Sequence, residues 1–578
     1  NVTTLSDAAL KRSDSASGWS KVVTADSTTG TLKINLTTLI NGPREYSLLT
    51  YAAPSSYDAN SGEIAALVSG ITFQTPVVNG VDRNQALFLA GGESTNPRDY
   101  DPATEHDSGD KRIYSGLVSL DANLHVVADL AQSWDISKDG TVYTFHLRPN
   151  AKFQDGRPVV AQDVIYSWER AAAPATKSDT VLTYLGDIVG VADMHSGKTQ
   201  HISGLKAPDA QTLQVTIDAA KPYFLFKLTM PVAFILDQKN VASGSNWYRT
   251  PNGTGPYKLA RWDSFKLMVY DANPYYYLGK PAIPQIVVEL YTGIGIDLYE
   301  SGEIDMTGVS SADVSRVLDP ADPLHADLVS GASMCTDYVT FDVTRPPFDD
   351  VRVRQAFTMA FDRQKFVDVV DNGIGIPAKG LYPPSLPGYN PALQGLPYDP
   401  QQARQLLAQS RYGGPQGLPA IVFTSEGIGN TAGADVAAMA QMWQQNLGVN
   451  ITIENLEPDK YSDLLYSGQH GQIFSGGWCA DYPDPENFAD VLFHTGAQQN
   501  LGNYSNPALD ALLDQARVEQ DVSKRIQLYQ QAEQIIVQDA PALFLSHGVT
   551  YTLVKPYVKG FVLTPIDIPI ERYLWLQH

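Results

Sequence analysis

The sequence contains few cysteines and few basic residues for its length. Only two of its 578 residues are cysteines, and 41 Lys and Arg residues face 63 Asp and Glu residues, which gives a formal net charge of −22. Nucleic-acid binding requires Lys and Arg clustered against the phosphate backbone, and the sequence has no basic run. The same deficit disfavours electrostatic docking on an anionic membrane surface. We therefore expect no nucleic-acid partner.

Long apolar runs are missing as well. No stretch reaches the ~18 uncharged apolar residues that a membrane-spanning helix requires, and the nearest candidate, Tyr223 to Leu236, is interrupted by Lys227. Residues 1–21 are polar and lack the apolar centre of a signal peptide. The sequence is thus expected to be that of a cytosolic protein or of a mature secreted chain.

Motifs of the common enzyme classes are also missing. The sequence has no Gly-x-Ser-x-Gly elbow, no P-loop, no Gly-x-Gly-x-x-Gly and no His-Glu-x-x-His, and its ten His residues are scattered. Asp481, Asp484 and Glu486 could act in acid–base chemistry, but they stand among prolines, where Asp usually forms turns. We therefore expect no catalysis, no cofactor and no metal site.

The residues that are present indicate a folded protein of several lobes. Hydrophobic residues make up 43% of the chain, and the length suggests roughly four domains or lobes. After Cys335 the pattern alternates, with a strand at 337–343, one helix capped by Asp349 or Asp350 and running to about Asp371, and a helix opening at Asp399-Pro400. This alternation predicts α/β lobes with largely parallel sheets. The first 84 residues, rich in Ser, Thr and Ala, predict a few strands.

Several short segments occur in the order found in one known family. They are Phe153 to Val159 with Asp163 to Trp168, Gly253 to Leu259, Ser301 to Met306, Pro347 to Ala356, Tyr398 to Pro400, and Trp478 to Pro485. From about Ala86 to His578 the sequence resembles the extracytoplasmic solute-binding proteins of peptide ABC importers, the oligopeptide- and dipeptide-binding family 5. The resemblance implies a two-lobed α/β fold of the type II periplasmic-binding-protein class, with an additional β-rich domain and hinged lobes that close on the ligand.

The family fold implies a division of the chain. Residues 85–114, 239–334 and 550–578 would form lobe I, residues 115–238 the additional β-rich domain, and residues 335–549 lobe II. The two connections between the lobes would cross at about Cys335 and Thr550. Residues 1–84 lie outside this pattern, and we assign them no role.

The segment Trp478 to Tyr482 is similar to the one that, in oligopeptide-binding members, places a carboxylate against the α-ammonium group of the ligand. Asp481 matches that carboxylate, which would bind the ammonium through a charge-assisted hydrogen bond. The resemblance also places Ser475, Gly477 and Cys479 beside the ligand, whose backbone would pair as an added strand. The alternative is that Asp481 only caps the turn before Pro483.

Counting alone leaves the two cysteines open, since they can be two buried thiols or a disulfide that marks an oxidising compartment. The resemblance implies a disulfide between Cys335 and Cys479, because an enterobacterial oligopeptide-binding relative has a pair at these places. In that relative, arginines neutralise the C-terminal carboxylate of the ligand, whereas this sequence has Ser475 and Tyr466 there. Glu105 lies near another acid that the family keeps at the flank of the ligand, or is a solvated loop residue.

The resemblance implies a monomeric receptor that delivers oligopeptides to the membrane permease of an ABC importer. It would lie outside the cytoplasm, either in a periplasm or at the cell surface, lipid-anchored through a residue upstream of Asn1. One alternative is an oligosaccharide receptor of the same fold that stacks sugars on some of its 30 Tyr and 8 Trp side chains. An extracellular hydrolase and a nickel or metallophore carrier are further alternatives, but no nucleophile motif and no His or Cys cluster supports them.

Overall fold

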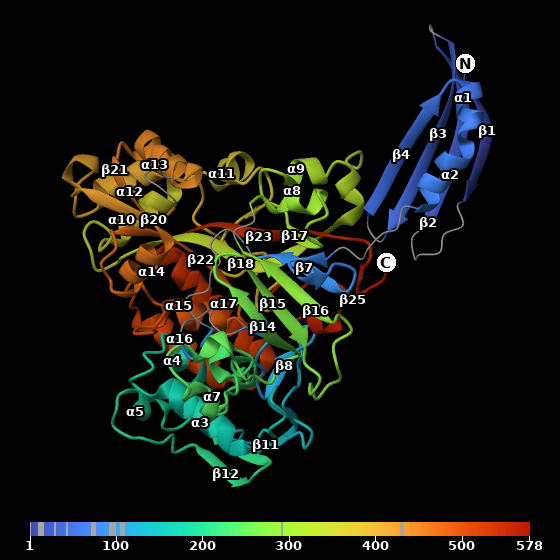
Figure 1. Cartoon of the computed structure of the whole chain (residues 1–578). Helices are drawn as coiled ribbons and strands as arrows, with labels where there is room; N and C mark the ends of the chain where they lie inside the picture. The colour runs from blue at the N-terminus through green and yellow to red at the C-terminus, as the bar shows by residue number, and fades with distance from the viewer. Residues whose placement is uncertain are drawn as a thin grey trace.

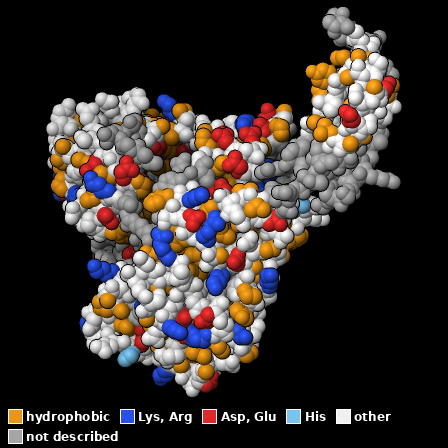
Figure 2. Space-filling model, in the orientation of Figure 1, with side chains coloured by type: hydrophobic (Ala, Val, Ile, Leu, Met, Phe, Trp, Pro, Cys, Tyr) orange, Lys and Arg blue, Asp and Glu red, His pale blue; other side chains and the backbone are white. Residues whose placement is uncertain are grey.

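The computed structural model describes residues 2–9, 17–27, 30–41, 44–70, 77–91, 100–104, 110–290, 293–427 and 433–578. The chain forms a body of several layers, from which the N-terminal module projects (Figure 1). On the face shown in Figure 2, acidic and basic side chains are interspersed over the body. Among the described helices, none is long and apolar enough to cross a lipid bilayer.

The N-terminal module is a four-stranded antiparallel sheet with two helices on one face. Its strands are β1 (Val2–Ala9), β2 (Ser17–Ser27), β3 (Gly30–Asn41) and β4 (Arg44–Ala52), in that order, and its helices are α1 (Pro54–Ala59) and α2 (Ser61–Gly70). Lys33 on β3 pairs with Asp58 of α1 and lies over the ring of Tyr57, which fixes α1 on the sheet. The alternating runs predicted the strands but not the two helices.

An eleven-stranded sheet runs through the body. Its order is β14 (Tyr257–Asp263), β15 (Leu267–Ala272), β16 (Gln285–Glu289), β7 (Ala86–Ala90), β17 (Met306–Gly308), β23 (Ala542–Val554), β18 (Leu328–Phe341), β22 (Ile473–Cys479), β20 (Ile421–Glu426) and β21 (Ile451–Leu456), and β19 (Ile376–Pro377) pairs with β23. One half packs on a core that contains Tyr257, Tyr270 and Ile286. The other half packs on a core that contains Phe357, Phe423 and Trp443.

The expectation of largely parallel sheets is wrong for this central sheet. Parallel pairing is confined to β16–β7, β7–β17, β20–β21 and β20–β22, and the other pairs are antiparallel. The cause is the long pair β18 and β23, which run antiparallel to each other through both halves of the sheet and also pair antiparallel with β22 and β17. Strand–helix alternation predicts only pairs joined by a crossover helix, such as β20 and β21 around α13 (Ala434–Leu447).

The helix expected from Asp350 to about Asp371 is two helices, α10 (Val351–Met359) and α11 (Arg363–Val369). Asp350 and Asp362 each cap one of them by accepting a backbone N–H bond, so Asp362 restarts the chain as a new helix. Helix α12 (Pro400–Gln409) begins after its Asp399 cap as predicted, and α13 ends at Gly448, whose φ of 72° suits glycine. The other helices of this part are α14 (Pro458–Tyr466), α15 (Glu486–Phe493), α16 (Pro507–Val518) and α17 (Val522–Asp539).

Residues 115–238 build a separate core below the central sheet in the view of Figure 1. Its antiparallel sheet has the order β10 (Ala131–Ile136), β11 (Val142–Leu147), β13 (Thr212–Thr216) and β12 (Leu205–Asp209), and its helices are α3 (Ala161–Ala172), α4 (Val181–Leu185), α5 (Val191–His195) and α6 (Phe224–Lys227). Strands β10 and β11 turn at Asp139-Gly140, as the sequence predicts. Tyr482, far along the chain, is part of this core.

The remaining short elements connect these parts. They are the strand pairs β5 (Val77–Val78) with β6 (Val81–Asp82), β8 (Val118–Leu120) with β9 (Val126–Ala128) and β24 (Val558–Lys559) with β25 (Trp575–Leu576), and the helices α7 (Gln238–Val241), α8 (Gly295–Glu300) and α9 (Val314–Val317). Arg83, after β6, is 2% exposed and pairs with Asp305, so the residues just before β7 are fixed to the central sheet.

Candidate functional site

The candidate site is built on strand β22 and on the turn that follows it. Ser475, Gly477, Trp478 and Cys479 lie on β22, and Asp481 lies in the turn before α15. Strand β22 is held on one side by β18, with which it pairs from Ile473 through to Cys479. This pairing therefore fixes the position and direction of the segment in the sheet.

Asp481 is half-buried and oriented by two neutral donors. Its Oδ2 accepts a hydrogen bond of 2.6 Å from the hydroxyl of Tyr184 on α4 and one of 2.7 Å from the side-chain amide of Asn487 on α15. Neither of these two donors carries a charge. The alternative that Asp481 only caps its own turn does not account for the contact with Tyr184.

Asn487 also couples Asp481 to Trp478. Its Oδ1 accepts the backbone N–H of Asp481 at 2.9 Å and the indole N–H of Trp478 at 3.1 Å. The Asn487 side chain is fully buried, so these bonds are shielded from water. A single amide thus fixes both the strand end and the carboxylate.

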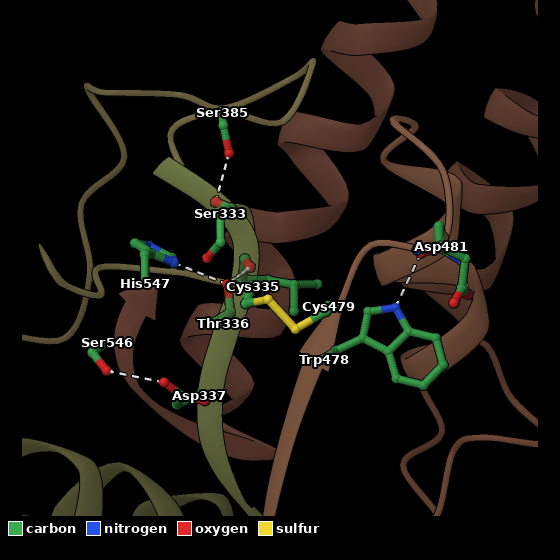
Figure 3. Close-up of a disulfide and its surroundings, with 12 residues drawn as sticks. Ser333, Cys335, Thr336, Asp337, Ser385, Trp478, Cys479, Asp481, Ser546 and His547 are labelled. Carbon is green, nitrogen blue, oxygen red and sulfur yellow. Dashed lines mark hydrogen bonds between the residues drawn. A yellow bond between two sulfur atoms is a disulfide. The ribbon is translucent and has the colours of Figure 1, made fainter. Parts of the chain in front are cut away.

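A disulfide joins Cys335 of β18 to Cys479 of β22 across 144 residues of sequence. The two cysteines are direct partners in the antiparallel register of the two strands. Figure 3 shows the disulfide, Trp478 and Asp481 following one another along the strand and the turn. The bridge therefore locks the register that places the site residues.

The second edge of β22 is open over most of its length. Strand β20 pairs with β22 only at Ile473 and Phe474, and no other strand in the described part of the chain pairs with this edge over 475–479. Gly476 and Gly477 are both exposed. An open edge with glycines lets the backbone of another chain approach and pair.

Four of the residues predicted to bind the ligand line two pockets. Asp481 lines the first, of about 480 Å³ when space open to solvent is included, together with Lys111, Asp129 and Arg572. Ser475, Gly477 and Trp478 line the second, of about 690 Å³ on the same basis, together with Tyr466. Asn487, which bonds both Trp478 and Asp481, connects the two.

A buried group of charges lies behind the turn. Lys227 of α6 lies 3.0 Å from Glu486 and 3.1 Å from Asp187. Burial lowers the pKa of Lys227, but the two carboxylates together raise it by more than burial lowers it. The net shift of the pKa is therefore upward, and the ammonium stays charged. Burial raises the pKa of Glu486 to about 7, although Lys227 opposes this rise. These groups hold the 115–238 region against the turn.

Two of the predicted residues do not line either pocket. Tyr482 is fully buried, donates its hydroxyl to Glu486 and packs on Phe226 at 6.1 Å between ring centroids. Cys479 is exposed and engaged in the disulfide. Glu105 lies outside the described residues.

The prediction from sequence missed the residues that orient the carboxylate. Asn487 lies only six residues after Asp481, so its closeness in sequence could have suggested it. Tyr184 lies 297 residues away from Asp481, and no pattern in the sequence points to it. The described residues contain no group of three His, Cys, Asp or Glu side chains arranged to hold a metal ion.

Comparison with known proteins places these features in a family. The model of the bacterial extracellular solute-binding proteins, family 5 Middle, matches residues 125–500. The periplasmic oligopeptide-binding protein OppA of Escherichia coli is 30% identical over 540 residues, which cover 89% of this chain and 97% of that protein. The probable deoxycholate-binding periplasmic protein YgiS of the same organism is 31% identical over 480 residues, covering 80% and 88%.

Solved structures of one relative share the fold of this chain. The murein tripeptide binding protein MppA of Escherichia coli superposes with a TM-score of 0.75 at 27% identity, covering 86% of this chain and 99% of that one. MppA in its unliganded open form gives a TM-score of only 0.63. The chain therefore superposes less well on that open form.

Proposed function

This chain belongs to the bacterial extracellular solute-binding proteins of family 5, and on this premise we propose that it binds oligopeptides outside the cytoplasm and delivers them to the membrane permease of an ABC importer. Members of the family are receptors, and we propose that this one likewise makes and breaks no bond in its ligand. The relative OppA is named for oligopeptide binding and MppA for a murein tripeptide.

The observation that carries the proposal is the placement of Asp481. A peptide of arbitrary sequence offers one constant cation, its α-ammonium group. A half-buried carboxylate that is oriented by neutral donors and lines a pocket recognises such a cation by a charge-assisted hydrogen bond. Neutral sugars have no ammonium group to pair with this carboxylate.

The open edge of β22 supports recognition of the second constant feature, the peptide backbone. A strand added along residues 475–479 would exchange main-chain hydrogen bonds with β22 whatever its side chains are. One ligand would then contact Asp481 with its first residue and β22 with the residues that follow.

We propose that the lobes divide as the family implies, at 85–114 with 239–334 and 550–578, at 115–238, and at 335–549. The pairing of β18 with β23 shifts register between Ala332 and Thr336, opposite residues 547–549. A bulge bends a strand locally, so this irregularity, near the expected crossings at Cys335 and Thr550, supports a hinge there.

The test is a binding measurement on Asp481→Asn by titration calorimetry. Losing the charged partner of the ligand ammonium should cost roughly 2–5 kcal/mol of binding free energy, whereas Asp463→Asn, a matched change of an exposed carboxylate on α14, should cost none. N-acetylation of the peptide should weaken binding to the wild type in the same way. Equal affinity for free and N-acetylated peptides would overturn the assignment of the ligand.

The ligand class has a direct readout in native mass spectrometry of freshly purified protein. We expect retained masses that differ by amino-acid residues. Hexose spacing would assign an oligosaccharide instead, and a single retained mass of a bile acid would assign a ligand such as that of YgiS.

A further inference from the structure

The pocket beside β22 differs from the one at Asp481 in its charge. We call it the β22 pocket, and the side chains that dominate its wall are Tyr338, Tyr466, Phe474, Trp478, Phe493 and Gln499. Among the described residues that line it, none is Asp, Glu, Lys, Arg or His. The pocket at Asp481, by contrast, contains Lys111, Asp129, Asp567 and Arg572.

The two buried phenols of the β22 pocket are neutral as well. Burial raises the pKa of Tyr338, and burial together with Asp539 raises the pKa of Tyr504, so both hydroxyls stay protonated at neutral pH. Asp337 is adjacent in sequence, but alternate residues of a strand face opposite sides, and its carboxylate accepts a bond from Ser546 on the other side (Figure 3).

The pocket lies on one face of the sheet beside the open edge of β22. Its floor consists of alternate residues of two paired strands, Tyr338 and Thr340 of β18 and Phe474, Gly476 and Trp478 of β22. A peptide paired along the open edge would direct every second side chain to this face. Gly476 adds no side chain to the floor of the pocket, and a Cβ at this position would lie 3.1 Å from the Tyr338 ring.

We infer that the β22 pocket is a selectivity site of the receptor, which admits an uncharged, preferably apolar or aromatic, interior side chain of the peptide and rejects a carboxylate. This inference rests on the proposed peptide-binding function. A carboxylate transferred from water into the pocket finds no cation among the described residues that line it, and burying an unpaired charge is costly. The site therefore selects against Asp, Glu and a free C-terminal carboxylate at this position of the peptide. Asp481, by contrast, binds only the N-terminal ammonium group of the peptide.

The mouth of the pocket contains a residue at which the selectivity can be reversed. The Tyr466 hydroxyl lies across the mouth and donates to Oε1 of Gln499 at 3.2 Å. Gln499 is buried and neutral, so Gln499→Lys places one ammonium in the wall without changing the strand. Gln515, exposed on α16 and outside the pocket, provides the matched control Gln515→Lys.

The experiment is a position scan by titration calorimetry. Unmodified alanine peptides of three to eight residues establish the length bound best, and each position of that length after the first is then changed to Leu, Phe, Glu or Lys. We expect one position at which Glu binds about tenfold more weakly than Leu or worse, and a reversal of this order in Gln499→Lys but not in Gln515→Lys. Thermal unfolding of each variant checks that it is folded.

The outcomes separate the two proposals. If the alanine peptides bind and every position accepts Glu as well as Leu, the pocket is not selective and this inference is wrong, while the proposed function stands. The inference is also wrong if folded Gln499→Lys still binds the Leu peptide more tightly than the Glu peptide. If no peptide binds the wild type at any length, the proposed function and this inference fail together.

Discussion

The ammonium of Lys227 and the carboxylate of Glu486 form a buried ion pair between regions that are far apart in the sequence. Nζ of Lys227 and Oε1 of Glu486 lie 3.0 Å apart, and the two side chains are 6% and 4% exposed. Lys227 ends α6 in the 115–238 region, and Glu486 begins α15, five residues after Asp481. The pair therefore fixes the 115–238 region to the turn that carries the proposed ammonium site, and opening of the lobes at the proposed hinge would separate it.

We expect Lys227→Met to weaken peptide binding at pH 8. The variant leaves Glu486 buried without its partner in the closed form, and removing one member of a buried pair costs ~3–5 kcal/mol. The double variant Lys227→Met/Glu486→Gln should recover most of the affinity, because residue 486 then carries no charge and Asp187 keeps Lys221 as its partner at 2.6 Å. Calorimetry measures the affinities, and small-angle scattering should report a more open Lys227→Met. An equal loss in the single and double variants would show that the two residues are not coupled.

The sequence predicts helix caps and tight turns better than it predicts the pairing of strands. Caps such as Asp399 and turns such as Asp139-Gly140 depend on neighbouring residues, so their positions can be predicted locally. The antiparallel pair β18 and β23 joins residues about 200 positions apart, and no local pattern specifies it. The prediction of largely parallel sheets failed for this reason.

The same distinction applies to the candidate site. Asp481, Trp478 and the disulfide could be inferred because the whole segment resembles one family motif. Tyr184, which orients Asp481, comes from the other side of the proposed interface between lobes and has no motif of its own. The neutrality of the β22 pocket also arises from residues of six separate segments, so only the folded chain shows it.

The disulfide offers a second prediction, for Cys335→Ser/Cys479→Ser. The bridge closes a loop of 144 residues, and loss of that constraint on the unfolded chain lowers stability by up to ~5 kcal/mol in the chain-entropy account. Because the two cysteines also fix the register of β18 and β22, we expect peptide binding to weaken too. Chemical denaturation and calorimetry measure the two effects. Unchanged affinity after reduction and alkylation would limit the bridge to a stabilising role.

The hydrogen bonds of Asn487 lead to a third prediction. Asn487→Ala removes the amide that orients the Asp481 carboxylate and leaves the buried indole N–H of Trp478 without this acceptor. Each lost bond of this kind costs ~1–3 kcal/mol, and we expect peptide affinity to fall by about tenfold or more as Asp481 loses its orientation. The exposed Asn450→Ala is the matched control. A normal affinity in folded Asn487→Ala would show that Tyr184 alone suffices to place the carboxylate.

A fourth prediction concerns Glu533, a buried carboxyl on α17 whose raised pKa is opposed by backbone hydrogen bonds and not by a charged group of the described residues. It is 1% exposed, its Oε1 accepts the backbone N–H of Tyr382 at 2.9 Å, and its Oε2 has no hydrogen-bond partner among the described residues. Burial raises the pKa of Glu533 from 4.5 to about 7, although the backbone bonds from Tyr382 and Leu381 oppose the rise. The folded protein therefore holds a proton at this carboxyl that the unfolded chain has already released at pH 6.

Because the folded-state pKa is raised, the contribution of Glu533 to stability is complete below pH 4.5 and is lost as the pH rises through about 7. A shift of this size corresponds to ~3 kcal/mol. We expect Glu533→Gln, which cannot ionise, to lose less free energy of unfolding than the wild type between pH 5 and pH 8 in urea titrations. Glu426→Gln, a matched change of an exposed side chain on β20, should follow the wild type. Parallel pH profiles for Glu533→Gln and the wild type would show that Glu533 is ionised in the folded protein throughout this range, with water or a local rearrangement solvating its charge.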